Sequence, residues 1–510
     1  MRPTFNLVRE PWIPCIRPGG AAVELGLAET LTCAHTFTGI EGRSPVETAA
    51  LYRLLLAVLH RVFGPRTQAE WVELWEEGRF DPARLEDYFS RWEERFDLFD
   101  PQRPFYQTAD DRVQPRSALA MMFEMAAGNN ATLFDHHTDE EGLSLKPAEA
   151  ARALAAYQAF GLSGICHPQK NLYFTAAPAV GGILFLIEGD SLFETLMLNL
   201  LRYNDTSPDE NLCAGPQDAP IWERDDPFSP IRKTPLGYLD YLTWPNRRIM
   251  LFPEKTQEGT VVRQITTAPG LEMSPDILDP LKHYRLDPET GYRALRFQEE
   301  KALWRDSAAL LRLDDSKARP PLAFRQAAGL VIDGTLDPAA RYRTLALGMA
   351  NDKAKVEFLR LERVPLPAAF FEQEDLVALL ERGLADAAAT RNHLRTAVYI
   401  MASLLLAVQS DTPDGRKADQ KDISNLISHW GCDRLYWSSL ETAFLAFLED
   451  LPTAGPDGLR AWQNTLQRSA WQSFDHAARL AGDSTAALKA AVQARGKLAF
   501  DLKKQYEPVP

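Results

Sequence analysis

The C-terminal end of this chain constrains its fold more than any other part. Four blocks there have apolar residues at the spacing of amphipathic helices, at about 373–409, 421–450, 457–481 and 484–507. Runs that favour turns separate the blocks, such as Gly455-Pro456-Asp457-Gly458. Because short links between long amphipathic helices favour antiparallel neighbours, the sequence predicts a four-helix bundle over residues 369–510.

The preceding residues mix helical and strand signals. Ser44-Pro45-Val46-Glu47 is a capping box and opens a helix. Leu172–Ala176 and Ile183–Glu188 have the composition of strands, and prolines are frequent between such segments. We therefore expect an α+β protein, in which an irregular mixed α/β body over residues 1–368 is followed by the C-terminal bundle.

Composition and charge exclude several classes of protein. The chain has 56 Lys and Arg against 70 Asp and Glu, a net charge of −14, which argues against non-specific wrapping of nucleic acid but leaves room for a small basic patch. No apolar run approaches the roughly 20 residues that a membrane-spanning helix needs, and the N-terminus lacks the apolar stretch of a signal peptide. Five scattered cysteines do not form a disulfide framework. We expect a soluble cytoplasmic protein without a membrane partner.

The motifs of common catalytic sites are missing from the sequence. It contains no H-E-x-x-H, C-x-x-C, P-loop or G-x-S-x-G pattern. We expect a protein that is not an enzyme, with no catalytic residue, no metal ligand and no cofactor. Basic pairs such as Arg232-Lys233 and Arg247-Arg248 have the pattern of solvated loops.

Two other functions remain open at this point. Asp135, His136, His137 and Asp139 lie close together in the sequence, and such groups hold the metal ions of some phosphoesterases. A polar loop tip explains this cluster as well, because the further aspartates of such a site are missing upstream apart from Asp110-Asp111. The second alternative is a structural scaffold whose bundle bridges other subunits.

The N-terminus carries a family resemblance. Phe5-Asn6-Leu7-Val8-Arg9-Glu10-Pro11-Trp12-Ile13-Pro14 resembles the start of the CasA family, the large subunits of type I-E CRISPR Cascade surveillance complexes. Further matches follow in the order of that family, at Arg103-Pro104-Phe105-Tyr106-Gln107-Thr108, at Ala219-Pro220-Ile221-Trp222 and at Gly237–Trp244 before Arg247-Arg248-Ile249. Together with the C-terminal bundle, the resemblance covers nearly the whole chain.

The resemblance implies a binding protein and its partners. Subunits of this family recognise the protospacer-adjacent motif in duplex DNA, mainly from the minor groove, and start to separate the strands. They also recruit a helicase-nuclease. The implied partners are therefore a double-stranded DNA target, a guide CRISPR RNA, the other Cascade subunits and that helicase-nuclease. The minor groove presents a degenerate pattern of donors and acceptors, which suits recognition of several motifs.

The resemblance also implies which residues bind RNA. The family's loop phenylalanine, which docks against the 5′ handle of the guide RNA, corresponds to Phe134, and Asn130 lies in the same loop. Phe134 is then a stacking group for RNA. The alternative is that Phe134 only anchors the loop to the protein core.

Three further elements correspond to DNA contacts of the family. The glycine loop matches residues 161–164, where the missing Cβ atoms let DNA approach the backbone; Gly161 is alternatively an ordinary helix cap. Arg263 takes the place of a minor-groove lysine. The strand-splitting hairpin falls at 351–355 and lacks the glutamine of the best-known version, so a lysine or the backbone forms the wedge. The expected DNA-binding residues are Gly161, Gly164, Arg263, Asn351, Lys353, Ala354 and Lys355.

Overall fold

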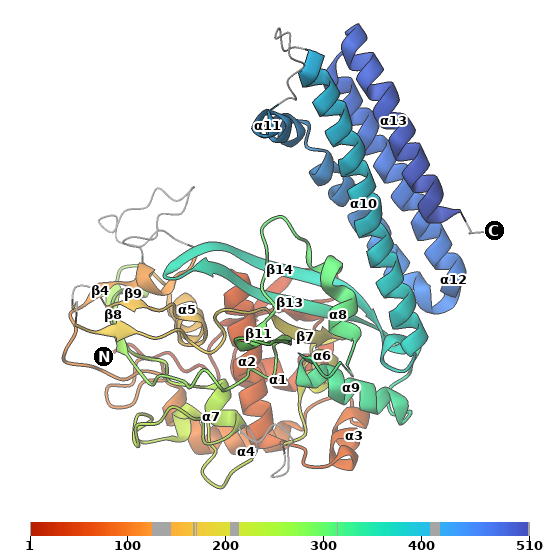
Figure 1. Ribbon diagram of the computed structural model, residues 1–510. Coiled ribbons are helices and arrows are strands. Elements are labelled where there is room, and N and C mark those ends of the chain that lie inside the picture. The colour runs from red at the N-terminus through yellow and green to blue at the C-terminus, as the bar shows by residue number, and fades with distance from the viewer. Residues whose placement is uncertain are drawn as a thin grey trace. The chain divides into compact units, whose positions relative to one another are not determined.

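The computed structural model describes residues 2–124, 144–166, 169, 171–203, 214–313, 315–408 and 419–507. The chain forms two compact units that interleave in sequence. The first contains residues 1–302, 313–336 and 342–363, and the second contains 303–312, 337–341 and 364–510. Figure 1 labels helices and strands of both units.

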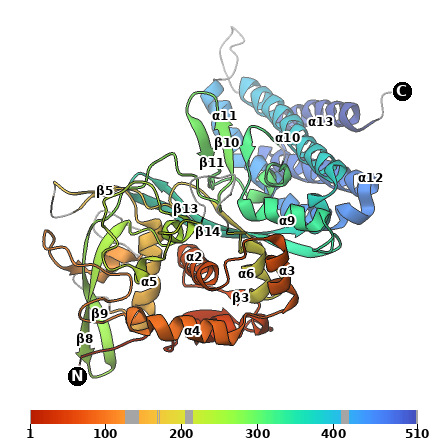
Figure 2. The same cartoon turned by 90° about the horizontal axis from the view of Figure 1, so that it is seen from below.

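The helices of the first unit are organised around α2 (Pro45–Val62), in which every residue from Val46 to His60 is buried. Its start confirms the predicted cap: the Ser44 hydroxyl accepts from the Glu47 N–H at 3.4 Å, whereas the Glu47 carboxylate accepts from the Arg43 N–H at 2.8 Å. Figure 2 shows α5 and α6 on either side of α2. The other helices of this unit are α1 (Leu27–Thr32), α3 (Gln68–Glu76), α4 (Pro82–Trp92), α5 (Pro147–Phe160), α6 (Leu192–Asn199), α7 (Tyr238–Leu242) and α9 (Leu322–Ile332), with short 3-10 helices at Ala34–Thr36, Glu93–Phe96, Ala118–Met121 and Ile221–Glu223.

Small sheets of two or three strands cover this helical core in the described part of the chain. The strands occur in the spatial orders β2–β1–β3, β4–β9–β8, β5–β6, β14–β13–β7 and β11–β10–β12. Their bounds are β1 (Ile13–Ile16), β2 (Ala22–Leu25), β3 (Gly39–Ile40), β4 (Arg116–Ser117), β5 (Gly164–Ile165), β6 (Tyr173–Phe174), β7 (Leu184–Glu188), β8 (Arg247–Thr256), β9 (Gly259–Pro269), β10 (Tyr284–Asp287), β11 (Gly291–Ala294), β12 (Ala318–Arg319), β13 (Arg341–Asp352) and β14 (Lys355–Pro367). The two strands predicted from composition are present as β6 and β7, both shorter than expected.

The second unit is dominated by the long helices α10 (Glu374–Val408), α12 (Cys432–Ala481) and α13 (Thr485–Tyr506). α12 breaks at Gly455, whose φ is 51°, in agreement with the predicted turn. The sequence missed a second break at Gly431, which has a left-handed conformation and separates α12 from α11 (Gln420–Trp430). Shorter elements of this unit are α8 (Ser307–Leu311) and 3-10 helices at Leu303–Asp306 and Ala368–Phe371.

Aromatic side chains fill the core of the second unit. The Trp304 ring stacks on Phe444 with 4.4 Å between ring centroids. Trp462 donates from Nε1 to the Gly383 carbonyl at 2.9 Å, and a Cβ at Gly383 would lie 3.0 Å from the Phe447 ring. The expected fold class is therefore confirmed: a mixed α/β region with small sheets precedes a long helical C-terminal region. Among the described residues, no helix has both the length and the apolar character needed to cross a bilayer.

Candidate nucleic-acid interface

The glycine loop follows α5 directly. Gly161 caps that helix, because its N–H donates to the Tyr157 carbonyl at 2.9 Å. A Cβ built on Gly161 would lie 2.8 Å from Nη2 of Arg247. The Tyr157 carbonyl oxygen lies at the same 2.8 Å, so the glycine is required both by the helix end that it caps and by a distant side chain packed beneath it, and the sequence did not reveal the second reason. Gly164 begins β5 and pairs with Phe174 of β6.

Arg247 holds this loop from below. Its buried guanidinium donates to the carbonyl oxygens of Leu162 at 2.7 Å and Thr175 at 2.9 Å, and it also bonds the side chain of Asn246. The guanidinium lies 4.5 Å from the centroid of the Phe174 ring. Burial lowers the pKa of Arg247, and no ion pair joins it to a carboxylate in the described part of the chain. The expectation that the Arg247-Arg248 pair is solvated is therefore wrong for Arg247, because the carbonyls of two loops replace water around it.

The predicted hairpin is present at the end of β13 and the start of β14, joined by Lys353 and Ala354. Lys353 has a φ of 51°, and its carbonyl accepts from the Asn351 side chain at 3.0 Å, which fixes the turn. Lys353, Ala354 and Lys355 are exposed. Neither lysine forms an ion pair with another described residue, so the turn presents two cations to solvent.

The glycine loop and this turn lie against each other. A Cβ built on Gly164 would be 3.5 Å from the Cβ of Ala354, which is ordinary van der Waals contact. Figure 1 shows the tip of the β13–β14 hairpin on the same side of the unit as α5, β8 and β9. The structure therefore brings together two of the three elements that the resemblance assigned to DNA.

Arg263, the third element, lies on β9. It is half-exposed and its Nη1 forms an ion pair with Oε2 of Glu254 on β8 at 2.8 Å. The same strand reaches the glycine loop further on, where the Cys166 thiol donates to the Thr267 carbonyl and packs on Ala268. At about 3.3 Å per residue, Arg263 stands roughly 15 Å along the strand from that contact. Arg263 therefore lies on the strand that packs against the loop, but away from the point of contact, and the two belong to different sheets.

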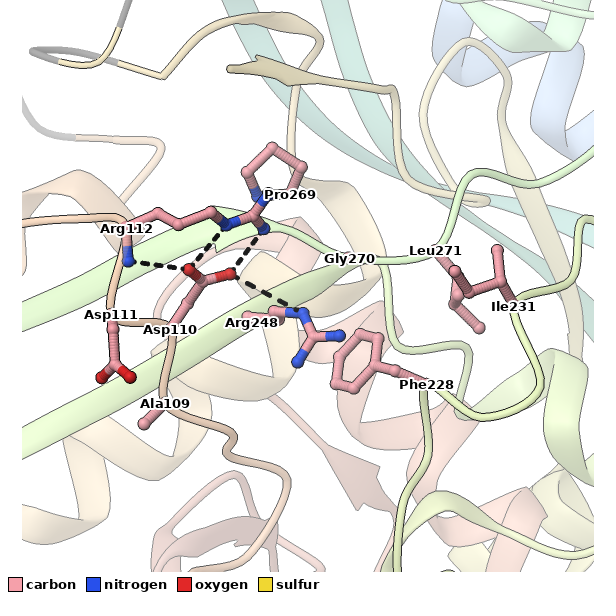
Figure 3. A pocket seen from close by; sticks show the side chains of 10 residues that line it. All are labelled: Ala109, Asp110, Asp111, Arg112, Phe228, Ile231, Arg248, Pro269, Gly270 and Leu271. Atoms are coloured by element: carbon pink, nitrogen blue, oxygen red, sulfur yellow. Dashed lines mark hydrogen bonds and ion pairs between the residues drawn. The ribbon is translucent and has the colours of Figure 1, made fainter. Parts of the chain in front are cut away.

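A pocket of about 590 Å³ opens beside the end of β9 (Figure 3). Asp110 lies at one side of it and accepts from Nη2 of Arg112 at 2.6 Å, with Nε of Arg248 at 3.8 Å. The hydrogen bond from Arg112 lowers the pKa of Asp110, and Arg248 adds to the effect. The Arg248 guanidinium also lies 3.8 Å from the centroid of the Phe228 ring. The pocket is lined by Ala109, Asp110, Asp111, Arg112, Phe228, Ile231, Arg248, Pro269, Gly270 and Leu271.

This pocket was not expected from the sequence, because its residues come from four separate segments. Asp110 and Asp111 balance the charges of its two arginines, so the pocket offers less attraction to phosphate than the exposed turn does. Arg232 is also paired, since it donates to the buried carboxylate of Asp240 at 3.1 Å; the expectation that the Arg232-Lys233 pair is solvated is wrong for this residue.

Several predicted residues lie outside the described ranges. These are Asn130 and Phe134, expected to bind RNA, and the cluster Asp135, His136, His137 and Asp139. In the part of the chain that is described, no group of three or more His, Cys, Asp or Glu side chains is placed to hold a metal ion.

Solved structures place this arrangement in a class of CRISPR-associated proteins. Cse1 from Acidimicrobium ferrooxidans superimposes with a TM-score of 0.82 over 100% of both chains, at 25% identity. CasA (Cse1) from Thermus thermophilus superimposes with a TM-score of 0.80 over 98% of this chain and 99% of that one, at 31% identity. A chain of a structure titled "CRISPR RNA-guided surveillance complex" shares the fold, with a TM-score of 0.75 over 98% of this chain and 100% of its own and 22% identity.

Sequence comparison gives the family. The family model described as CRISPR-associated protein Cse1 matches residues 6–473. The chain is 35% identical over 503 residues to the CRISPR-associated protein CasA/Cse1 of Thermus thermophilus, covering 96% of this chain and 95% of that protein. The chain belongs to the Cse1 family, and the resemblance to CasA is confirmed.

Proposed function

We propose that this chain is the large subunit of a CRISPR RNA-guided surveillance complex and contacts the protospacer-adjacent motif in duplex DNA. It reads that motif from the minor groove, helps to separate the strands so that an R-loop forms, and recruits a helicase-nuclease. It does this without catalysing a reaction itself. Family membership supports the placement in a complex. The approach of Gly164 to Ala354 is the observation that carries the DNA-contacting part.

The juxtaposed loop and turn suit a DNA backbone. Lys353 and Lys355 are exposed cations without ion-pair partners among the described residues, and such lysines set affinity and its salt dependence. The Gly161–Gly164 loop is held by Arg247, so its backbone presents a fixed edge. Contacts of backbone groups to a degenerate groove give modest discrimination between motifs.

Strand separation follows from the same surface. Opening duplex DNA costs about 1.4 kcal/mol per base-pair step, which pairing with the guide and contacts to the backbone offset. The turn carries Ala354 at its tip and no glutamine, so lysine or backbone groups enter between the strands. Arg263 contributes a further cation along β9.

Other partners enter through other surfaces. Asn130 and Phe134 hold the 5′ handle of the guide RNA, and the C-terminal bundle, proposed as residues 369–510, meets other Cascade subunits. Residues 1–368 form the DNA-recognition body. All of these partners are cytoplasmic, which is where we place the protein.

The test begins with the chain in its native host. An affinity tag on the chain should co-purify a short guide RNA and the other Cascade proteins. The purified complex is then mixed with target duplexes whose flanking base pairs are randomised. We expect enrichment of a small set of flanking motifs. Co-purification without any motif enrichment would leave only a scaffold role.

A further inference from the structure

The β5–β6 hairpin has two faces of different character. Gly164 pairs with Phe174 and Ile165 pairs with Tyr173 in an antiparallel register. Side chains alternate between the faces of a strand, so Phe174 points inward, and Cys166 does so as well. Both are buried, in a cluster with Val113 and Ala268. Packing of this cluster accounts for the inward face.

The outward face carries an exposed apolar pair. Ile165 is 44% exposed and Tyr173 is 63% exposed, and the two residues are direct cross-strand partners. Within the described chain, the Tyr173 side chain has no hydrogen bond, ring contact or cation–π contact. Neither side chain contributes to the core, and an aromatic ring next to a branched aliphatic side chain is a platform on which a flat apolar group can stack.

The position of this platform is defined by its neighbours. Gly164, which precedes Ile165, lies against Ala354, so the platform and the cationic 351–355 turn occupy the same tip of the unit. Lys353 and Lys355 of that turn are both exposed, so two cations lie near the platform.

A nucleobase fits this platform better than a protein partner does. A stable protein interface buries about 800 Å² on each partner, far more than two side chains supply. One aromatic side chain, in contrast, is matched in size to one base, and nearby cations match the phosphates on either side of it. The turn itself ends in the methyl group of Ala354, which is too short to hold a base away from its stack.

We propose that Tyr173, supported by Ile165, binds an unpaired base of the target DNA where the strands separate beside the 351–355 turn. This inference rests on the proposed function. By stacking on the displaced base, Tyr173 keeps that base out of the duplex, which the short side chain of Ala354 in the turn cannot do. The closed duplex does not need this contact, because its bases are stacked on each other.

The test uses the assembled complex and a target duplex in which 2-aminopurine is placed next to the flanking motif. The fluorescence of 2-aminopurine rises when this base unstacks. The affinity of the Tyr173→Ala complex for a closed duplex should stay within about twofold of the parent's affinity. The equilibrium constant for opening of the bound duplex should fall about tenfold. Tyr173→Phe should open normally, because the ring is retained. A duplex with a pre-formed mismatched bubble should bind the parent complex about tenfold more tightly than it binds Tyr173→Ala, because its unpaired base needs no opening before it stacks. Ile332→Ala, which removes a 63% exposed apolar side chain from α9 of the same unit, serves as the control.

Four results would overturn the inference. If the Tyr173→Ala complex opens the duplex normally, Tyr173 has no stacking role. If Tyr173→Phe loses as much opening as Tyr173→Ala does, the effect belongs to the hydroxyl and not to the ring. Loss of other subunits from the purified Tyr173→Ala complex makes the platform a protein contact. If the parent complex itself binds duplex DNA but never opens it, the proposed function fails together with this inference. If the parent and Tyr173→Ala open the duplex equally well, only this inference fails and the proposed function stands.

Discussion

The guanidinium of Arg247 donates a 2.7 Å hydrogen bond to the carbonyl oxygen of Leu162, which joins the start of β8 to the middle of the glycine loop. Arg247 also bonds Thr175, just beyond β6, so one buried cation ties together both ends of the β5–β6 hairpin. The loop that we place on DNA is therefore fixed from inside the protein, and its outer edge is free to make contacts.

Arg247→Met should loosen this loop. The substitution keeps much of the volume but leaves the carbonyls of Leu162 and Thr175 without donors, each at a cost of about 1–3 kcal/mol. Hydrogen exchange should accelerate at residues 161–166, and the free energy of unfolding should fall. Arg248→Met is the matched control, because Arg248 lies one residue away and bonds neither carbonyl. Unchanged exchange at 161–166 in Arg247→Met would show that the loop does not depend on Arg247.

Removal of both cations from the hairpin turn should weaken DNA binding without changing the motif preference. In Lys353→Ala with Lys355→Ala, affinity should fall for every target sequence. The slope of log affinity against log salt should become less steep by about 1.8, since each lost phosphate contact contributes about 0.9. A titration over several salt concentrations measures this. The double variant Lys317→Ala with Lys421→Ala removes the same charge from other exposed positions. An unchanged slope in the hairpin variant places the turn away from DNA.

The Asp110 carboxylate should stabilise the first unit in a pH-dependent way. Hydrogen bonds from Arg112 lower its folded-state pKa, so its contribution is complete above the unfolded-state pKa, about 4, and is lost as the pH falls through the lower folded-state value. Asp110→Asn should therefore reduce the free energy of unfolding by about 1–2 kcal/mol near neutral pH, and the difference should shrink on acidification.

Denaturant unfolding of both proteins near neutral pH and at about pH 3 measures this difference. Asp111→Asn is the control, because the Asp111 carboxylate points away from Arg112 and Arg248 (Figure 3). A stability difference of the same size at both pH values would mean that the ion pairs of Asp110 do not cause it.

Phe134→Ala should impair assembly rather than folding. The resemblance gives Phe134 a stacking role on the guide RNA, and loss of one such stack costs about 1–3 kcal/mol. Association of the chain with the guide-loaded complex should weaken, while circular dichroism of the isolated chain stays unchanged. Phe252→Ala removes another phenylalanine, one that is 38% exposed on β8 of the first unit, and should assemble normally. Normal assembly of Phe134→Ala would discard the RNA contact.

Local signals made much of the fold predictable. The Ser44 cap and the break at Gly455 each depend on residues within one turn of chain, so the sequence alone indicated them. Gly431 was missed because Trp430 and Cys432 on either side continue the apolar pattern of the helices. The long helices were predicted because their apolar stripes repeat many times.

The site was less predictable because its residues meet across long separations. Gly161 and Arg247 are far apart in sequence, and no local signal shows that the Arg247 side chain occupies the space that a Cβ at position 161 would need. Burial of Arg247 was missed for the same reason. The exposed pair of Ile165 and Tyr173 left only a weak signal, since strands this short give almost no alternation to detect.

The central claim is that the glycine loop and the hairpin turn form one DNA-contacting surface. Its most direct test places a photo-crosslinking amino acid at Ser163 in one variant and at Ala354 in another, within the guide-loaded complex on its target duplex. Because Gly164 lies beside Ala354, with room for little more than a methyl group between them, both positions should capture the same few base pairs beside the flanking motif. Capture of other subunits from both positions, with no DNA from either, would contradict the claim.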